Sequence, residues 1–144
     1  MAVDGVYEPS PKGWVRQQVE AYESSGGTRG LTLNGKPVVV MTMRGAKSGK
    51  VRKTPVMRVE HDGRYAVVAS NGGSRKHPLW YANLLADPHI HLQDKTEHFD
   101  MTVREVKGAE RADWWRRALD VWPPYDDYQR KTDREIPVLV LEPT

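Results

Sequence analysis

Cysteine is absent from the 144-residue sequence, which excludes a disulfide framework, a thiolate zinc site and a cysteine nucleophile. Long apolar runs are absent as well, since none comes near the roughly 18 residues that suggest a membrane-spanning helix. No signal peptide is recognisable at the N-terminus. We therefore expect a cytoplasmic protein without stable membrane insertion, for which peripheral membrane association stays open. The length predicts a single domain that buries about two-thirds of its unfolded surface.

Acidic residues are missing from one long stretch of the chain. There is none between Glu23 and Glu60, whereas eight of the 22 Lys and Arg residues lie there. The formal net charge of +3 therefore combines a segment of +8 with a remainder of −5. Such a local excess indicates an anionic partner.

The centre of this stretch, MRGAKSGKVRKTP at residues 43–55, has the composition of an anion-binding loop with no carboxylate to neutralise its cations. Its glycines permit left-handed backbone and a close approach of main-chain N–H groups. Lys47, Ser48 and Lys50 add compact charges and a hydroxyl, and Arg52 adds a planar fork that suits two phosphate oxygens. The spacing differs from that of a Walker A loop. The alternative is a solvated basic hairpin without a ligand.

The remaining pattern predicts a small α+β fold that is mainly β. An amphipathic helix is expected over residues 11–24. The expected strands cover residues 38–43, 54–60, 64–70, 89–93, 96–105 and 136–141, and further helices begin at Pro78 and Ala109. Short connections favour an antiparallel, closed or partly split barrel with about three flanking helices. We divide the chain into a leader with its helix, residues 1–30, and a barrel domain, residues 31–144.

Three other features are candidates for a site. Residues 70–74, Ser-Asn-Gly-Gly-Ser, form a second glycine loop. The rings of Trp122, Tyr125 and Tyr128 lie on an expected linker interrupted by prolines, where they could wall a flat ligand or simply pack. His89 and His91 share one face of an expected strand, but without a third ligand we expect a surface pair and no metal site.

Three segments, taken in order, resemble the deazaflavin (coenzyme F420)-dependent nitroreductase family. They are RGAKSGKVRKTPV from Arg44, VVASNGGSRKHPLWYANLLADP from Val67 and VWPPYDDYQRKTDREIPVLVLEP from Val121. The resemblance runs from about Leu31 to Pro143. It implies a split β-barrel of the kind that also binds FMN, in an actinobacterial enzyme that uses coenzyme F420.

The resemblance also implies a role for individual residues. The family's phosphate-binding element, G-x-K-S/T-G-x-x-R, is matched by Gly45, Lys47, Ser48, Gly49 and Arg52, with Lys50 as an extra charge for the acidic tail of the cofactor. The residues expected along the deazaflavin are Thr54, Pro55, Ala69, Ser70, Asn71, Gly72, Gly73, Pro78, Trp80 and Asn83. The substrate wall matches Trp122, Tyr125 and Tyr128, and the candidate proton donors are Tyr125, Tyr128 and Ser70.

The implied activity is that of an F420H2-dependent reductase, with a hydride passing to a planar, electron-poor acceptor. Candidate acceptors are a quinone, a conjugated lactone or enone such as a coumarin, and a nitroaromatic compound. Two alternatives remain, namely an FMN-dependent split-barrel oxidoreductase and a non-catalytic small barrel that binds nucleic acid. We favour a small-molecule partner over nucleic acid because the aromatic residues are far in sequence from the basic loop. The oligomeric state is left open, with a monomer favoured.

Overall fold

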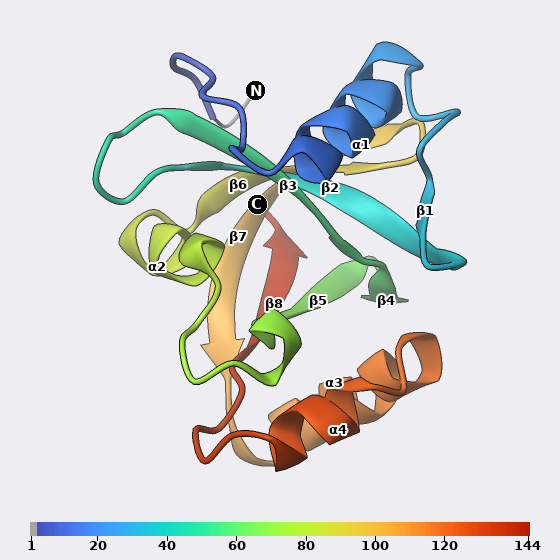
Figure 1. Cartoon of the computed structure of the whole chain (residues 1–144), viewed down its shortest axis with the longest axis vertical. Helices are drawn as coiled ribbons and strands as arrows, with labels where there is room; N and C mark the ends of the chain where they lie inside the picture. The colour runs from blue at the N-terminus through green and yellow to red at the C-terminus, as the bar shows by residue number, and fades with distance from the viewer. Residues whose placement is uncertain (1–2) are drawn as a thin grey trace.

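A single eight-stranded sheet forms the centre of the computed structural model, which describes residues 3–144 (Figure 1). The strands are β1 (Thr32–Leu33), β2 (Lys36–Arg44), β3 (Val51–Met57), β4 (Val59–His61), β5 (Arg64–Val68), β6 (His89–Asp94), β7 (Glu97–Val106) and β8 (Val138–Pro143). Their order is β1-β2-β6-β7-β8-β5-β4, and β3 pairs with β2 off this path. Every pair between these strands is antiparallel, as the short connections predict.

The sheet curls into a half-closed barrel because one chain segment, residues 51–61, contributes to both of its ends. β3 pairs with β2, whereas β4 pairs with β5. Between the two strands, Arg58 donates its N–H to the Pro37 carbonyl (2.9 Å) and its Nε–H to the Asp94 carboxylate (2.9 Å). The single strand predicted over residues 54–60 is therefore wrong, since the chain changes its partner at Arg58. The predicted split β-barrel is confirmed.

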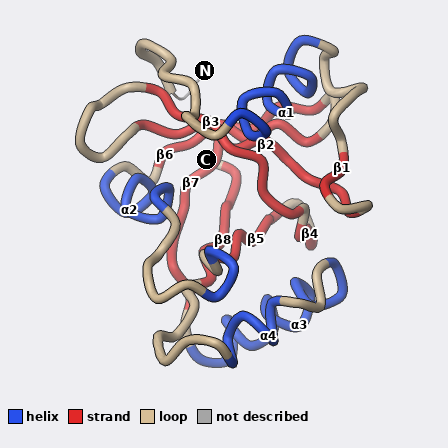
Figure 2. The backbone as a smooth tube through the Cα atoms, in the orientation of Figure 1, coloured by secondary structure: helices blue, strands red, loops and turns tan. Residues whose placement is uncertain are grey.

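The helices within residues 3–144 are α1 (Gly13–Ser24), α2 (Leu79–Ala86), α3 (Gly108–Val121) and α4 (Tyr125–Arg130), with a 3-10 turn at Asn71–Gly73 (Figure 2). The sequence predicted three helices and treated the segment of Tyr125 and Tyr128 as a linker. The linker assignment is wrong, because this segment forms the fourth helix, α4. The two prolines that end α3 also begin α4, because the fixed φ of proline suits the first turn of a helix. Both tyrosines therefore lie on a regular helix.

Three apolar clusters hold the helices around the barrel. The barrel interior contains side chains with at most 1% exposure, among them Met41, Met43, Ile90, Leu92, Leu139 and Leu141. Burying each such side chain contributes roughly 1.5–3 kcal/mol. α1 packs Val15, Val19 and Tyr22 on β2, and α3 and α4 pack on β5 and β8. The β2–β3 loop, α2 and the 3-10 turn remain along one side of the barrel (Figure 1).

The histidines and turns of the sheet agree only in part with the sequence. The predicted hairpin at Asp62-Gly63 is confirmed, with φ angles of 52° and 78° between β4 and β5. The predicted surface pair is wrong for His91, which is 9% exposed and whose Nε2 lies 2.9 Å from Nδ1 of His98. Residues 3–144 contain no group of three or more His, Cys, Asp or Glu side chains that could hold a metal ion. No helix in the same range is long and apolar enough to cross a membrane.

Candidate functional site

Residues 44–50, the cationic loop, join β2 to β3 and are closed by main-chain hydrogen bonds. The Gly45 N–H donates to the Lys50 carbonyl (2.7 Å), and the Gly49 N–H donates to the Gly45 carbonyl (3.0 Å). The φ of Gly49 is 70°, a conformation that glycine adopts without strain. The Ser48 hydroxyl oxygen accepts the Lys50 N–H (3.1 Å), so its own proton is available to a ligand.

A cavity of about 460 Å³ lies between the cationic loop and the end of α2. Lys47 and Ser48 line it, together with Asp87, the residue that follows α2. Lys47 is exposed and has no ion-pair partner within residues 3–144. It is therefore the cation most available to an incoming anion.

The other cations of residues 43–55 form ion pairs with carboxylates. This finding corrects the expectation that no carboxylate neutralises them. The carboxylates come from distant parts of the chain, in the pairs Arg44–Asp87 (3.4 Å), Lys50–Glu8 (3.4 Å), Arg52–Glu8 (2.5 Å) and Lys53–Glu23 (2.8 Å). These pairs are partly exposed, so a ligand that carries several negative charges can compete for them.

The two faces of β3 differ in what they contact. Side chains alternate along a strand, so Arg52 and Thr54 lie on one face, and Lys53 and Pro55 lie on the other. Lys53 reaches Glu23 of α1, which identifies its face as the one covered by that helix. Of the predicted cofactor residues on β3, Arg52 and Thr54 thus share a face, whereas Pro55 is buried on the α1 side.

α2 links the cationic loop to residues 69–77, which we call the glycine loop. The Asn83 side-chain oxygen accepts the Ala46 N–H (2.9 Å), which fixes the helix to the cationic loop. Pro78 stands at the N-cap of α2, directly after the glycine loop. Trp80 is partly buried against the barrel interior. The predicted P-x-W-x-x-N residues therefore connect the two loops along one side of the barrel.

The glycine loop, residues 69–77, packs against α4. Asn71, Gly72 and Gly73 have φ angles of 46°, 64° and 83° in succession. A Cβ atom on Gly73 would lie 2.9 Å from the Tyr128 carbonyl oxygen, so glycine is needed there for the helix to approach. A Cβ atom on Gly72 would meet nothing within 4 Å, so this part of the loop is open to a ligand.

The three aromatic residues of the predicted substrate wall come together at α4. The Trp122 indole N–H donates to the Tyr128 hydroxyl oxygen (3.4 Å), and the rings of Tyr125 and Tyr128 meet edge to face at 6.2 Å. Tyr128 is partly buried, whereas Tyr125 is 6% exposed. Burial raises the pKa of the Tyr125 hydroxyl. Ser70, the third candidate donor, is 8% exposed.

Sequence reasoning missed two residues beside this assembly. Glu8 pairs with Arg52 and Lys50, although it precedes them by more than 40 positions. Arg134 donates hydrogen bonds to four carbonyls of the glycine loop. No spacing in the sequence signals either contact, because both join distant segments through side chains on irregular backbone.

Comparisons with known proteins bear on this arrangement. Residues 14–143 match the family described as F420H2-dependent quinone reductase. A quinone reductase of this name from Mycobacterium tuberculosis is 31% identical over 124 residues, which cover 83% of both chains. A solved F420H2-dependent reductase, FDR-A, is 52% identical, covers 74% of this chain and 94% of its own, and has a TM-score of 0.70.

Two further solved structures bear on the assembly and the fold. One, described as a domain-swapped dimer, is 49% identical, covers 92% of this chain and 100% of its own, and has a TM-score of 0.73. The monomer favoured from the sequence is not confirmed and stays a prediction. A heme binding protein from Mycobacterium smegmatis, 16% identical with a TM-score of 0.60 over 86% of this chain and 51% of its own, shares the fold alone. Since the family match spans almost the whole sequence, this chain belongs to the F420H2-dependent quinone reductase family.

Proposed function

We propose that this protein is an F420H2-dependent reductase that passes a hydride to a planar, electron-poor acceptor. The observation that carries the proposal is the packing of the glycine loop on α4: Gly73 lies against the main chain of Tyr128, whose hydroxyl oxygen accepts the indole N–H of Trp122. α2 connects this assembly to the cationic loop through Asn83 (Figure 1). A ligand with a flat ring at one end and phosphate and carboxylate groups at the other suits this order of features.

The residues present fit coenzyme F420 in the chemistry of their donors. The Lys47 ammonium and the Ser48 hydroxyl of the cationic loop can hold a phosphate. Arg52 and Lys50 can meet further negative charge once they release Glu8. At Gly72 the absence of a side chain lets a ring approach the backbone. FMN, which also carries a phosphate, is the alternative cofactor.

The proposed reaction divides the chemistry between the cofactor and the chain. When bound, reduced F420 supplies a two-electron hydride donor that the protein itself lacks. The chain orients the acceptor, excludes water and offers a proton. The Tyr128 hydroxyl accepts the indole N–H of Trp122, so its own O–H can donate to an oxygen that gains negative charge. Tyr125 and Ser70 rank behind Tyr128 because their side chains are more deeply buried, and solvent water is the competing proton source.

A quinone is the proposed acceptor class, with conjugated lactones or enones such as coumarins next and nitroaromatic compounds last. The edge-to-face rings of Tyr125 and Tyr128 and the indole of Trp122 favour a flat, aromatic partner. Binding of nucleic acid is less well supported than a small ligand, because the family that residues 14–143 match is one of quinone reductases.

The proposal is tested by mixing the purified protein with F420H2 and one acceptor of each class, and following the reappearance of oxidised F420. We expect turnover with a naphthoquinone at a higher kcat/KM than with a coumarin or a nitroimidazole. The proposal fails if none of these acceptors is reduced, or if reduced FMN supports turnover as well as F420H2 does.

A further inference from the structure

Arg134, in the segment between α4 and β8, uses its whole guanidinium group on the glycine loop. Nε donates to the Ser74 carbonyl (2.8 Å). Nη1 donates to the Ala69 carbonyl (3.2 Å) and contacts Nδ1 of His77 (3.1 Å). Nη2 donates to the carbonyls of Ser70 (2.8 Å) and Lys76 (3.4 Å). An arginine has five N–H donors, so each of them has a partner within this one loop.

The loop needs such support because its backbone is unusual. Asn71, Gly72 and Gly73 all have positive φ. For Asn71, which has a Cβ atom, this conformation carries a steric cost that glycine does not have. Four hydrogen bonds form within the loop: the N–H of Gly73 donates to the Ser70 carbonyl (2.9 Å), the N–H of Ser74 to the Asn71 carbonyl (3.1 Å), the Asn71 side-chain amide to the Lys76 carbonyl (3.0 Å), and the N–H of Lys76 to the Ser74 hydroxyl oxygen (3.2 Å). Arg134 donates to four carbonyls of the same loop, which doubles the number of hydrogen bonds that hold it.

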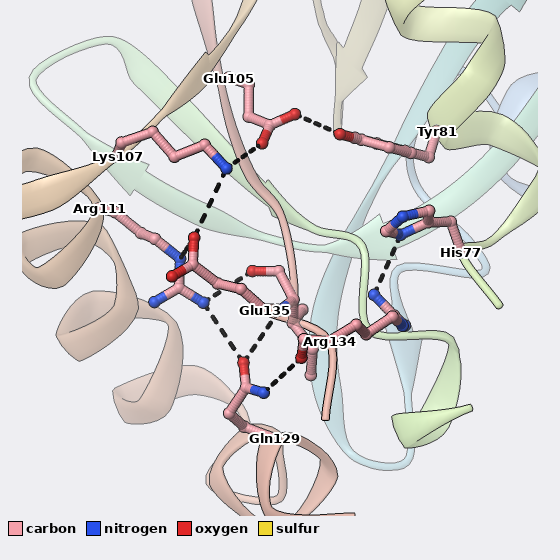
Figure 3. A network of polar contacts seen from close by, with 9 residues as sticks. His77, Tyr81, Glu105, Lys107, Arg111, Gln129, Arg134 and Glu135 are labelled. Atoms are coloured by element: carbon pink, nitrogen blue, oxygen red, sulfur yellow. Dashed lines mark hydrogen bonds and ion pairs between the residues drawn. The ribbon is translucent and has the colours of Figure 1, made fainter. Parts of the chain in front are cut away.

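Arg134 is held in place by α4, the helix that carries Tyr125 and Tyr128. The Gln129 side chain donates to the Arg134 carbonyl (2.8 Å) and accepts the Ile136 N–H (3.0 Å). Arg111 of α3 donates to the Ile136 carbonyl (2.7 Å). Figure 3 shows this chain of contacts from Arg111 through Gln129 to Arg134 and on to His77. Arg134 thus joins α4 to the glycine loop.

We infer that Arg134 is a positioning residue, which sets the distance and orientation between the glycine loop and the aromatic residues of α4. The inference rests on the proposed function, in which a ring approaches the glycine loop at Gly72 and the aromatic residues of α4 face the acceptor. Arg134 acts through the loop and not on the ligand, because its N–H groups are already occupied by the protein. His77 takes part as an acceptor at Nδ1, and the centroid of its ring lies 4.4 Å from that of Tyr81, with the two rings tilted by 42°.

The test compares Arg134→Gln and Arg134→Lys with Arg116→Gln. Arg116 is the control, because it is an exposed arginine of α3 whose ion pair is with Asp113 of the same helix (2.8 Å). Hydrogen exchange at the amides of residues 70–77 is measured without ligand. The dissociation constant for F420, and kcat and KM with a quinone, are measured with the same preparations.

In Arg134→Gln we expect faster exchange in residues 70–77, F420 binding weaker by about tenfold, and a lower kcat. Arg134→Lys should give loop exchange rates, an F420 affinity and a kcat between those of Arg134→Gln and the wild type, because an ammonium cannot reproduce the planar set of N–H donors of a guanidinium group. Arg116→Gln should keep the exchange pattern of the loop and the affinity for F420, and the salt dependence of binding should be the same in all variants.

Two results would overturn the inference, namely wild-type exchange of residues 70–77 in Arg134→Gln, or an equal loss of F420 affinity in Arg116→Gln. Failure of the proposed function gives a different result. If wild-type protein does not bind F420 but exchange in residues 70–77 is faster in Arg134→Gln and not in Arg116→Gln, Arg134 still positions the loop and the cofactor assignment is wrong.

Discussion

The carboxylate of Glu8 accepts a hydrogen bond from Nη1 of Arg52 at 2.5 Å and also lies 3.4 Å from Nζ of Lys50. Glu8 reaches these cations because residues 6–8 run beside β3. The Val51 N–H donates to the Val6 carbonyl (2.8 Å), and the Glu8 N–H donates to the Val51 carbonyl (2.9 Å). This segment precedes residues 14–143, the part that matches the family. Glu8 therefore places an internal anion on two cations that the proposed cofactor requires.

Glu8→Gln should strengthen F420 binding, because Arg52 and Lys50 no longer have to exchange one carboxylate for another. We expect the dissociation constant to fall several-fold, up to about tenfold, which corresponds to about 1.4 kcal/mol. Tryptophan quenching measures the affinity. Glu23→Gln is the control, since Glu23 pairs with Lys53 on the other face of β3 and should leave the affinity unchanged. Weaker binding in Glu8→Gln would show that Glu8 supports the ligand.

Arg52→Ala should weaken F420 binding by at least about tenfold, as expected for the loss of a charged hydrogen bond worth roughly 1.5–3 kcal/mol. The melting temperature should change little, because the ion pair of Arg52 with Glu8 is partly exposed and such pairs contribute about 0–1 kcal/mol. Lys53→Ala, which alters a cation on the α1 side of the same strand, is the comparison. Equal affinities in the two variants would remove Arg52 from the phosphate site.

Gly73→Ala should destabilise the protein more than Gly72→Ala does. Both residues have positive φ, so each substitution has a conformational cost of roughly 1–3 kcal/mol. Only at Gly73 would the added Cβ atom also meet main chain, 2.9 Å from the Tyr128 carbonyl oxygen. We expect an additional loss of about 1–3 kcal/mol, with a higher KM for the acceptor. Urea denaturation measures the difference, and equal stabilities would mean that α4 can yield at this contact.

Tyr128→Phe should lower kcat about tenfold, with little change in F420 affinity, because it removes the hydroxyl that Trp122 orients. Tyr125→Phe is the matched variant, and its effect should be smaller because that side chain is 6% exposed. Steady-state kinetics with one quinone distinguish the two. A larger effect of Tyr125→Phe would assign the proton to Tyr125, and unchanged rates in both would assign it to solvent.

His91 should make the protein less stable in mild acid. Burial lowers the pKa of His91, with a further lowering from His98 opposed by Asp100. Below the unfolded pKa of about 6.5 the unfolded chain binds a proton that the native state excludes, so stability falls as the pH drops from there toward the lowered native pKa. His91→Gln should flatten the melting temperature between about pH 7 and pH 5.5. An unchanged pH dependence of the melting temperature in His91→Gln would contradict this assignment.

The sequence predicted the regular parts of the fold because local patterns specify them. Alternating residues and the Asp62-Gly63 turn identified most strands. What could not be predicted depends on contacts between distant segments. Glu8 meets Arg52 across 44 positions, and Arg134 meets Ser70 across 64. The helix of Tyr125 and Tyr128 was missed because its six residues follow two prolines, which indicate a loop as readily as a helix start.

The most direct test of the account is a titration of the purified protein with F420 and, separately, with FMN, followed by tryptophan fluorescence. Trp122 hydrogen-bonds Tyr128, whose main chain lies against the glycine loop, so a ring bound at this assembly should quench it. We expect F420 binding in the micromolar range or tighter, weakened by Arg52→Ala, with FMN binding far weaker. Tight FMN binding would contradict the cofactor assignment, and binding of neither compound would contradict the enzyme proposal as a whole.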